Sequence, residues 1–492
     1  MRARLVLLAG ALVAFGASLG SGFHFDDYAI FSDPFLRSGW GWLEIWNLRQ
    51  TRPLTYLTFW LNYQVGGRDP LGYHFLNLAL HLGVVLLFYE CLRKLVPQRA
   101  AWIAAALFAV HPIQAEAVDY IWGRSIMLAA LFCGASLWAW LDGRRWLAML
   151  WFALALLAKE ECAAFPLVLL MLEWRRHPRK RGAARLPGWP HIAGMLALAL
   201  AAGARVIYAT AVTPGAPAGL QAGISPWKYF LAQGVVIPRY FRLMIIPYGF
   251  TVDPEIHVPP VWLGLLGWLA IAAVALWIWR RSPWLAAGLL LLLPSSSIFP
   301  AADLAADRRM YLPLFCFATA AGVGLTRLKW PAPRTSALGA PALGATMAAV
   351  LALVSVTRTY VWASDARLWR EAVRRAPDKI RPKIQLSRAV PAAEALELLA
   401  QAAIQSPYDP AVAAETGRVF LDERQPDAAL REFGRALALD PRNAQNFNNR
   451  GVALEELGQS EAARMDFEHA LTLDPHLTEA RENLEKLTGR ER

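Results

Sequence analysis

The chain has 492 residues, of which 56% are hydrophobic and only 18% are charged. Apolar runs of about eighteen residues or more recur along it, each long enough to cross a bilayer as a helix, which excludes an ordinary soluble protein. The formal net charge of +12 would suggest nucleic-acid binding in a soluble domain. Here the basic residues lie mainly in short loops between apolar runs, where they set membrane orientation instead.

The first twenty residues, MRARLVLLAGALVAFGASLG, have a basic start, an apolar centre and small residues at their end. A signal peptide and a first membrane span share this pattern, and we favour an uncleaved span. In either case the basic start stays in the cytoplasm, and Asp26 and Asp27 emerge on the other side, directly after the run. Adjacent carboxylates repel and are costly to desolvate near a membrane, so this pair is a candidate for function.

Hydropathy predicts about eleven spans in all. They lie at about 5–21, 74–91, 100–112, 124–141, 146–158, 163–174, 190–211, 261–279, 284–300, 311–326 and 338–359. The loops that fall on the side of the N-terminus are rich in Arg or Lys, as cytoplasmic loops are. Segment 225–250 carries three basic residues and two internal prolines, and a crossing there would move Arg280 and Arg281 outside. We therefore expect it to be an interfacial or re-entrant helix on the outer side.

Residues beyond about Tyr360 follow a different pattern, since the apolar runs stop and a helical period begins. Alanine, proline, phenylalanine and glycine recur 34 residues apart, as in the series Ala402, Ala436 and Ala470. This period is the signature of tetratricopeptide repeats, which stack as helix pairs into a solenoid. The sequence thus predicts an all-α protein with a membrane helix bundle at 1–360 and a repeat solenoid at 361–492. The solenoid either holds a peptide or protein partner or only caps the membrane part.

Five groups of polar residues lie at helix ends that the span count places on the outer side. They are Asp26 with Asp27, segments 52–63 and 72–81, segment 111–125, segment 158–166 and segment 299–313. A carboxylate can take a proton from a hydroxyl nucleophile, and arginine can hold a phosphate as it leaves. Together they suit transfer from a lipid-linked phosphate, and the outer side of a membrane offers polyprenyl-phosphate sugars as donors rather than nucleotide sugars.

Simpler explanations exist for several of these residues. Arg52, Arg308 and Arg309 could reach lipid headgroups, and Glu160 could only pair with Lys159. His74 and His81 lie seven apart on one helix face, a spacing that is more often found for packing or helix–helix hydrogen-bonding residues than for metal ligands. We expect no metal and no cofactor, because neither the histidines and acids nor the four scattered cysteines have ligand spacing.

The motifs and their order resemble the transmembrane-and-tetratricopeptide (TMTC) O-mannosyltransferases, which belong to the GT-C class of membrane glycosyltransferases. The resemblance rests on FDDYAI, RPLTYLTFWLNY, YHFLNLALH, HPIQAEAVDYIWGRS, AKE and ADRRMYLP, followed by the repeats. It implies a GT-C-type bundle and an inverting transferase that moves a sugar, mannose or another hexose, from a polyprenyl-phosphate donor to Ser or Thr of an acceptor protein. The short repeat array and the Ala- and Arg-rich composition point to a bacterial homologue in the inner membrane, with periplasmic repeats.

The resemblance also implies roles for individual residues. Asp26 and Asp27 match the family's acidic pair, and we expect one to accept the proton and the other to orient a substrate. Gly123 and Arg124 match the family's GR, although Ile126 replaces an acid that often follows it. In the ER-x-x-Y stretch, Asp307 stands where Glu is common. The residues expected to bind the donor phosphate or sugar are Arg52, His74, His111, Glu116, Arg124, Glu160, Asp307, Arg308, Arg309 and Tyr311.

Two other functions remain possible at this point. A membrane-anchored scaffold would use its repeats to recruit cell-envelope proteins, but one span would suffice to anchor it. A transporter of lipid-linked sugar would be expected to show internal repeats among its spans, and the sequence shows none. The expected partners are the lipid-linked donor, an acceptor protein or peptide held by the repeats, and membrane lipid, with no nucleic acid.

Overall fold

The computed structural model of the chain describes residues 1–492 except 32, 178–185, 214–217, 280–281, 329–338 and 491–492. Within the described ranges all regular elements are helices, and an isolated bridge pairs Ala218 with Ala301. The all-α class predicted from the sequence is confirmed. The chain divides into two compact units, Met1–Ser364 and Asp365–Arg492. The basic runs at 178–185, 280–281 and 329–338, which helped to predict orientation, lie outside the described residues.

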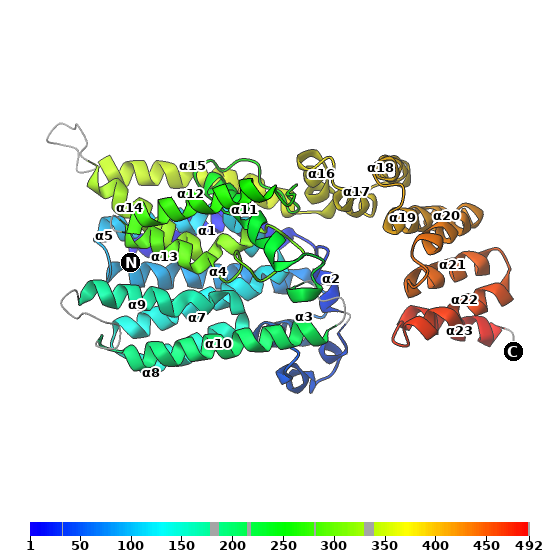
Figure 1. The fold of residues 1–492 in the computed structure, drawn as a ribbon, viewed down its shortest axis with the longest axis horizontal. Helices are drawn as coiled ribbons and strands as arrows, with labels where there is room; N and C mark the ends of the chain where they lie inside the picture. The colour runs from blue at the N-terminus through cyan, green and yellow to red at the C-terminus, as the bar shows by residue number, and fades with distance from the viewer. Residues whose placement is uncertain (32, 178–185, 214–217, 280–281, 329–338, 491–492) are drawn as a thin grey trace. The chain divides into compact units, whose positions relative to one another are not determined.

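The first unit is a bundle in which most helices run roughly alongside one another (Figure 1). Its main helices are α1 (Arg2–Phe15), α3 (Pro53–Gly66), α4 (Pro70–Arg93), α5 (Gln98–Val110), α7 (Arg124–Leu141), α8 (Arg145–Ala158), α9 (Phe165–Arg176), α10 (Trp189–Val212), α11 (Pro226–Ile245), α12 (Val261–Trp279), α13 (Pro283–Leu292), α14 (Tyr311–Arg327) and α15 (Gly339–Trp362). Short helical turns join them: η1 (Gly16–Gly20), α2 (Asp27–Ile30), η2 (Pro34–Arg37), η3 (Gly41–Trp46), η4 (Pro112–Gln114), α6 (Ala115–Val118), η5 (Ile121–Gly123), η6 (Glu160–Ala164), η8 (Gly219–Gln221) and η9 (Asp307–Met310).

Each of the eleven apolar segments predicted from hydropathy overlaps a helix over at least part of its length. Among the described residues, six helical segments are long and apolar enough to cross a bilayer: Arg2–Gly20, Pro70–Arg93, Ile121–Leu141, Trp189–Val212, Val261–Ile278 and Ala340–Trp362. A bent pair, Gln98–Val110 with Pro112–Val118, would make a seventh. A multi-pass membrane protein is therefore confirmed, whereas the number of eleven spans stays a prediction.

The segment predicted as a span at 284–300 is helical only as far as Leu292. Pro294 and the serines that follow end the helix, because proline cannot donate to the helical ladder and serine competes for backbone groups. The ten residues of α13 rise about 15 Å, half the thickness of a bilayer core. The remaining residues of this segment form part of the polar end of the bundle instead.

Helix α11 occupies the segment expected to be interfacial or re-entrant. It packs closely on α12, since a Cβ on Gly267 would lie 2.1 Å from the carbonyl oxygen of Gly234. On its other side, the Tyr229 hydroxyl donates to the Ser295 carbonyl (2.7 Å), and the Gln233 amide donates to the Leu304 carbonyl (2.9 Å). The helix thereby supports segment 295–307. Its placement relative to the membrane stays a prediction.

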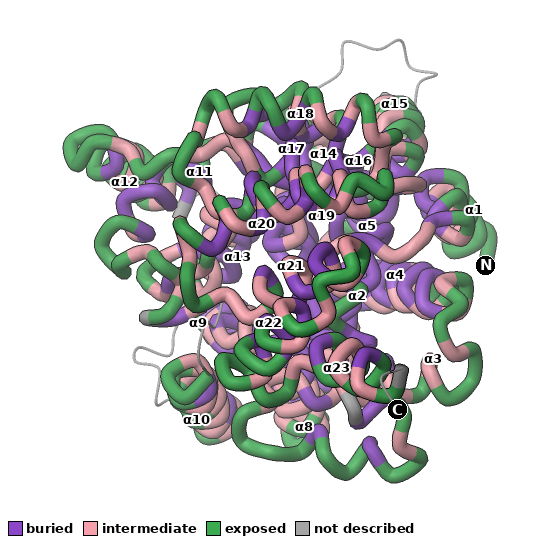
Figure 2. The backbone as a smooth tube through the Cα atoms, turned by 90° about the vertical axis from the view of Figure 1, so that its right-hand side faces the viewer, coloured by how far each residue is buried: buried purple, intermediate pink, exposed green. Residues whose placement is uncertain are grey.

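Helices α10 and α12 lie at the periphery of the bundle (Figure 2). Only 17% of the most apolar window of α10 and 11% of that of α12 are buried within the protein. Their exposed side chains are nevertheless mostly apolar, including Leu200, Leu269 and Trp277. An apolar, unburied helix surface is what a bundle presents to lipid.

The second unit consists of paired helices, as the repeat pattern predicts. They are α16 (Asp365–Arg375), α17 (Ile380–Ser387), α18 (Ala392–Gln405), α19 (Pro410–Asp422), α20 (Pro426–Leu439), α21 (Ala444–Glu456), α22 (Ser460–Leu473) and α23 (Thr478–Arg490). The periodic residues form its core: Ala402, Ala436 and Ala470 are fully buried, as are Phe433 and Phe467. The periodic glycines make room for the phenyl rings, because a Cβ on Gly451 would lie 2.6 Å from the ring of Phe467.

Candidate functional site

The acid pair lies at the end of the bundle opposite the start of α1 (Figure 1), and its two members differ. Asp27 is fully buried, and both its oxygens accept backbone hydrogen bonds: Oδ2 from the N–H of His24 and Oδ1 from the N–H of Trp122, each at 3.0 Å. Asp26 is exposed. Of the pair, Asp27 therefore fastens the loop to the protein, and Asp26 is the carboxylate that another molecule can reach.

The backbone is strained just before the acid pair. Phe25 has a φ of +22°, a conformation that costs a residue with a side chain about 1–3 kcal/mol. Its ring stacks on Tyr120, with centroids 4.7 Å apart, which helps to hold this turn. Burial raises the pKa of Asp27 to about 7, while its hydrogen bonds to the two backbone amides act in the opposite direction.

Gly123 and Arg124 directly follow Trp122, whose backbone N–H binds Asp27 in the loop of residues 22–52, here called the acid loop. A Cβ on Gly123 would lie 2.4 Å from the carbonyl oxygen of Ala117, so only glycine fits this turn. Arg124 is fully buried among neutral acceptors: Nε donates to Asn77 Oδ1 (2.9 Å), Nη1 to Asn62 Oδ1 (2.6 Å) and Nη2 to the Tyr73 carbonyl (3.0 Å). The structure thus places this expected donor-binding residue inside the bundle, where it joins α3, α4 and α7.

A second cluster of charges joins α3 to the turn after α8. Arg52 makes a two-pronged ion pair with Glu160, with Nε–Oε2 and Nη2–Oε1 distances of 3.1 and 2.7 Å. Nearby, buried Lys159 pairs with Glu161 at 3.3 Å. Burial alone would raise the pKa of Glu160, but the charge and hydrogen bonds of Arg52 outweigh it and lower that pKa to about 2. Glu160 is therefore ionised across the physiological range.

A cavity of about 250 Å³ opens beside this cluster. Its polar wall carries Arg52, Glu160, Glu161 and Arg309. Its apolar wall comes from α10 and from segment 294–301, and includes Val206, Ile207, Pro294 and Phe299. The polar wall carries two arginines and two glutamates, so it offers guanidinium N–H donors without a net charge. A phosphate with a hydrocarbon chain would meet these donors on one side and the apolar wall on the other.

A third cluster surrounds the ADRRMY stretch. The Arg308 backbone N–H donates to Glu116 Oε2 (3.2 Å), and its guanidinium pairs with the other oxygen of Glu116 and, at 3.7 Å, with Asp303. Asp307 is buried and accepts from Arg239 of α11 at 2.7 Å. Arg309 donates to the carbonyls of Asp303 (2.8 Å) and Leu304 (3.2 Å). These contacts bring together sequence groups that lie up to 192 residues apart.

Tyr120 connects the acid pair to this third cluster, and sequence analysis did not single it out. It is fully buried and stacks between Phe25 and Trp362, with centroid distances of 4.7 and 5.7 Å. Burial raises the pKa of its phenol well above the usual value; Asp27 and Asp26 raise it further, and Arg308 lowers it. Its hydroxyl therefore lies within electrostatic reach of both the acid pair and Arg308. An aromatic residue in an aromatic-rich chain gives no sequence signal of such a place.

The remaining expected site residues contact the protein itself. His74 Nε2 donates to the Gly22 carbonyl and His111 Nε2 to the Met244 carbonyl, each at 3.0 Å. The Tyr311 hydroxyl donates to His81 Nδ1 (2.8 Å), because His81 Nε2 faces the Ala109 carbonyl and must carry the proton. His74 thereby anchors the start of the acid loop, and Tyr311 lies in the bundle core. Among the described residues, no three His, Cys, Asp or Glu side chains are grouped to hold a metal ion.

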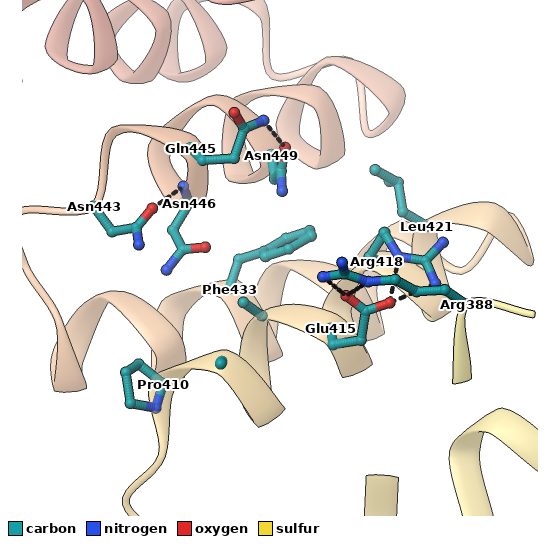
Figure 3. Close-up of a pocket in the computed structure, with 12 residues that line it drawn as sticks. Arg388, Pro410, Glu415, Arg418, Leu421, Phe433, Asn443, Gln445, Asn446 and Asn449 are labelled. Atoms are coloured by element: carbon teal, nitrogen blue, oxygen red, sulfur yellow. Dashed lines mark hydrogen bonds and ion pairs between the residues drawn. The ribbon is translucent and has the colours of Figure 1, made fainter. Parts of the chain in front are cut away.

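The repeat unit has a groove of its own, of about 470 Å³, between α19 and α21 (Figure 3). At one end, Glu415 is held between two arginines, with Arg388 Nη2 at 2.8 Å from Oε2 and Arg418 Nε at 2.6 Å from Oε1. At the other end lie four carboxamides: Asn443, Gln445, Asn446 and Asn449. Glu415 and Asn449 are one repeat apart, as is Asn483 from Asn449, so polar groups recur along one face.

Comparison with known proteins identifies relatives over much of the chain. Human protein O-mannosyl-transferase TMTC4 is 26% identical over 461 residues, which cover 76% of this chain and 62% of that protein. Mouse protein O-mannosyl-transferase TMTC3 is 38% identical over 129 residues, 23% of this chain and 14% of that protein. The chain is thus similar in sequence to TMTC protein O-mannosyl-transferases over about three quarters of its length. It spans less than two thirds of the length of these relatives.

The comparisons also include a family profile and solved structures. A tetratricopeptide-repeat family profile matches residues 432–465, which confirms the predicted repeats. Among solved structures, ArnT from Cupriavidus metallidurans bound to undecaprenyl phosphate aligns over 94% of this chain and 79% of its own, with 12% identity and a TM-score of 0.40. The tetratricopeptide protein YrrB aligns over 34% of this chain and 88% of its own, with 20% identity and a TM-score of 0.23.

Proposed function

We propose that the chain is an inverting membrane glycosyltransferase that moves a sugar, mannose or another hexose, from a polyprenyl-phosphate donor to a Ser or Thr hydroxyl of an acceptor protein. The observation that carries the proposal is a cavity with the guanidinium groups of Arg52 and Arg309 on one wall and apolar side chains on the other, together with one exposed carboxylate, Asp26. Homology to protein O-mannosyl-transferases supports it.

In the proposed reaction, the acceptor oxygen attacks the anomeric carbon from the face opposite the phosphate. The new C–O bond forms as the bond from the anomeric carbon to the phosphate oxygen breaks, and polyprenyl phosphate leaves with the electron pair. Asp26 accepts the hydroxyl proton as general base. Asp27 acts as a positioning residue, because both its oxygens are already engaged by backbone N–H groups.

The leaving phosphate would lie against the polar wall of this cavity. Arg52 and Arg309 line the cavity there, and Glu160 holds the guanidinium of Arg52 in place. Val206, Ile207 and Phe299 would contact the first part of the lipid chain. Arg308 lies within electrostatic reach of Tyr120, as Asp26 does, and would offset negative charge that develops near Asp26.

The repeat groove would hold the acceptor protein. Carboxamide side chains can donate and accept together, so Asn446 and Asn449 could pair with the backbone of an extended segment. We propose that repeats and acid pair share the outer side of a bacterial inner membrane, with the N-terminus in the cytoplasm. Transfer would then occur in the periplasm.

Purified full-length protein in lipid vesicles tests the proposal. It would be given radiolabelled polyprenyl-phosphate mannose or other lipid-linked hexoses together with periplasmic extract. We expect label to enter a protein band with wild-type chain and not with Asp26→Asn. Movement of intact lipid-linked sugar across the vesicle, without any transfer, would instead assign the chain as a transporter and overturn the proposal.

A further inference from the structure

A large cavity lies at the end of the bundle opposite the acid pair. It has a volume of about 810 Å³ and is formed where α1, α5 and α15 begin and where α4 and α14 end. Arg99 and Arg327 line it together with Tyr89 and Trp102. The residues described as lining it include no acidic side chain.

The two arginines give the cavity a positive charge. Both are exposed, and within the described part of the chain neither guanidinium forms an ion pair. This differs from Arg4 and Arg93 at the same end of the bundle, which both pair with Glu90, at 2.8 and 2.9 Å. Arginine binds phosphate through two parallel N–H donors, so an unpaired arginine couple in a cavity fits a phosphate diester.

An apolar groove leads away from this cavity. Its volume is about 180 Å³, and Trp102 lines both spaces. The groove is lined by small or aliphatic side chains of three helices, including Gly10 of α1, Ala106 of α5 and Ala349 of α15. Along α5 it extends from Trp102 to Val110, which at 1.5 Å per residue is about 12 Å, close to the depth of one bilayer leaflet.

We propose that this cavity and groove bind one anionic glycerophospholipid, with the phosphate between Arg99 and Arg327 and one acyl chain in the groove. The geometry favours this occupant because the charged end opens at the end of the bundle and the apolar end continues toward its middle, as the two parts of a lipid do in a leaflet. Tyr89 and Trp102 would lie at the depth of the ester groups, where aromatic side chains are favoured. This site is separate from the one proposed for catalysis.

Native mass spectrometry of the full-length chain tests the proposal. The protein would be released from vesicles containing equal amounts of phosphatidylglycerol and phosphatidylcholine. We expect one phosphatidylglycerol to be retained preferentially, and Arg99→Gln with Arg327→Gln to lower that preference about tenfold. Arg2→Gln removes the same charge at the same end outside the cavity lining, so it should leave the preference unchanged.

A second variant tests the groove without touching the charges. Ala349→Phe adds bulk to the groove from an exposed position, and it should reduce retention of both lipids. Leu353→Phe adds bulk one turn further along α15 outside the groove lining, and should reduce neither. Equal retention of the two lipids by the wild type would overturn the proposal. So would retention of polyprenyl phosphate in place of phosphatidylglycerol when both are supplied.

Discussion

Asp26 and Asp27 are neighbours in the sequence, but only one of them is free to meet a substrate. The acidic pair itself was apparent from the sequence, directly after an apolar run. Its asymmetry was not, because it depends on a backbone N–H of Trp122, 95 residues further along the chain. Tyr120 was missed for a similar reason, since its position between the acid pair and Arg308 follows only from tertiary contacts.

Exchanging each aspartate for asparagine should separate the two roles. Asp26→Asn keeps size and exposure, so we expect normal thermal stability and a loss of about 100-fold or more in transfer rate. The asparagine of Asp27→Asn has a single acceptor oxygen, whereas two backbone N–H groups bind Asp27. Because one of these donors loses its partner, we expect the variant to lose about 1–3 kcal/mol of stability and also transfer activity. Glu44→Gln changes an exposed acid of the same loop and serves as control. A near-normal rate for Asp26→Asn would place the base elsewhere.

The raised pKa of Asp27 predicts how stability changes with pH. With a folded pKa of about 7 and an unfolded value near 4, the unfolded chain releases this proton first as pH rises. The folded protein should therefore lose stability between about pH 4 and pH 7 and no more above that. Glu160, with its pKa of about 2, stays ionised throughout this window.

Melting temperatures of wild type and Asp27→Asn from pH 4.5 to 8 measure this effect. The melting temperature of the wild type should fall as the pH rises through this range. The melting temperature of Asp27→Asn should be lower at pH 4.5 and should change less with pH. Parallel profiles for the two proteins would mean that the carboxyl of Asp27 does not titrate in this range.

At the scale of helices, hydropathy located every apolar segment, but it could not give their lengths. Helix α13 ends at Leu292 because of Pro294 and the serines that follow it. The bend between α5 and α6 occurs at Pro112. In the repeat unit, the sequence period marked the core residues directly, because each repeat places the same residue at the same contact.

The glycines of α20 and α21 offer a matched pair of substitutions. Gly451→Ala would bring a methyl group within 2.6 Å of the Phe467 ring and should destabilise the repeat unit by about 1–3 kcal/mol. Gly434→Ala meets no atom within 4 Å and should stabilise α20 by about 0.5–1 kcal/mol. Proteolysis of a C-terminal tag on the full chain in increasing urea measures both. Equal changes in stability for Gly451→Ala and Gly434→Ala would contradict the view that the periodic glycine is needed to make room for the phenyl ring.

At the scale of the whole molecule, the sequence predicted a membrane bundle and a repeat solenoid, and the helices and the repeat profile confirm both. The membrane topology depends on how many helices cross the bilayer, and the lengths of the helices do not decide this number. Within the described residues, six of the predicted spans fall on α-helices of 10 to 17 residues: α1, α5, α8, α9, α13 and α14. Of these, α1 is prolonged by the helical turn η1 as far as Gly20.

The eleven-span topology predicts that the C-terminus lies outside the cytoplasm. A reporter that works only in the periplasm should be active when fused after Arg492, and a reporter that works only in the cytoplasm should be silent there. The reverse result would require an even number of crossings. It would also separate the repeats from the acid pair, which the proposed function places in one compartment.

The stack of Phe25, Tyr120 and Trp362 limits where the repeat unit of one protein can be replaced by that of another. Trp362 ends α15, its backbone carbonyl accepts a hydrogen bond from His24 (2.6 Å), and the second unit begins only three residues later, at Asp365. A chain cut after Tyr360 would lose this tryptophan and loosen the acid loop, whereas a cut after Ser364 would keep it. A chimaera that carries the repeat array of a relative should therefore keep Trp362 and place its junction in the few residues between Trp362 and Asp365.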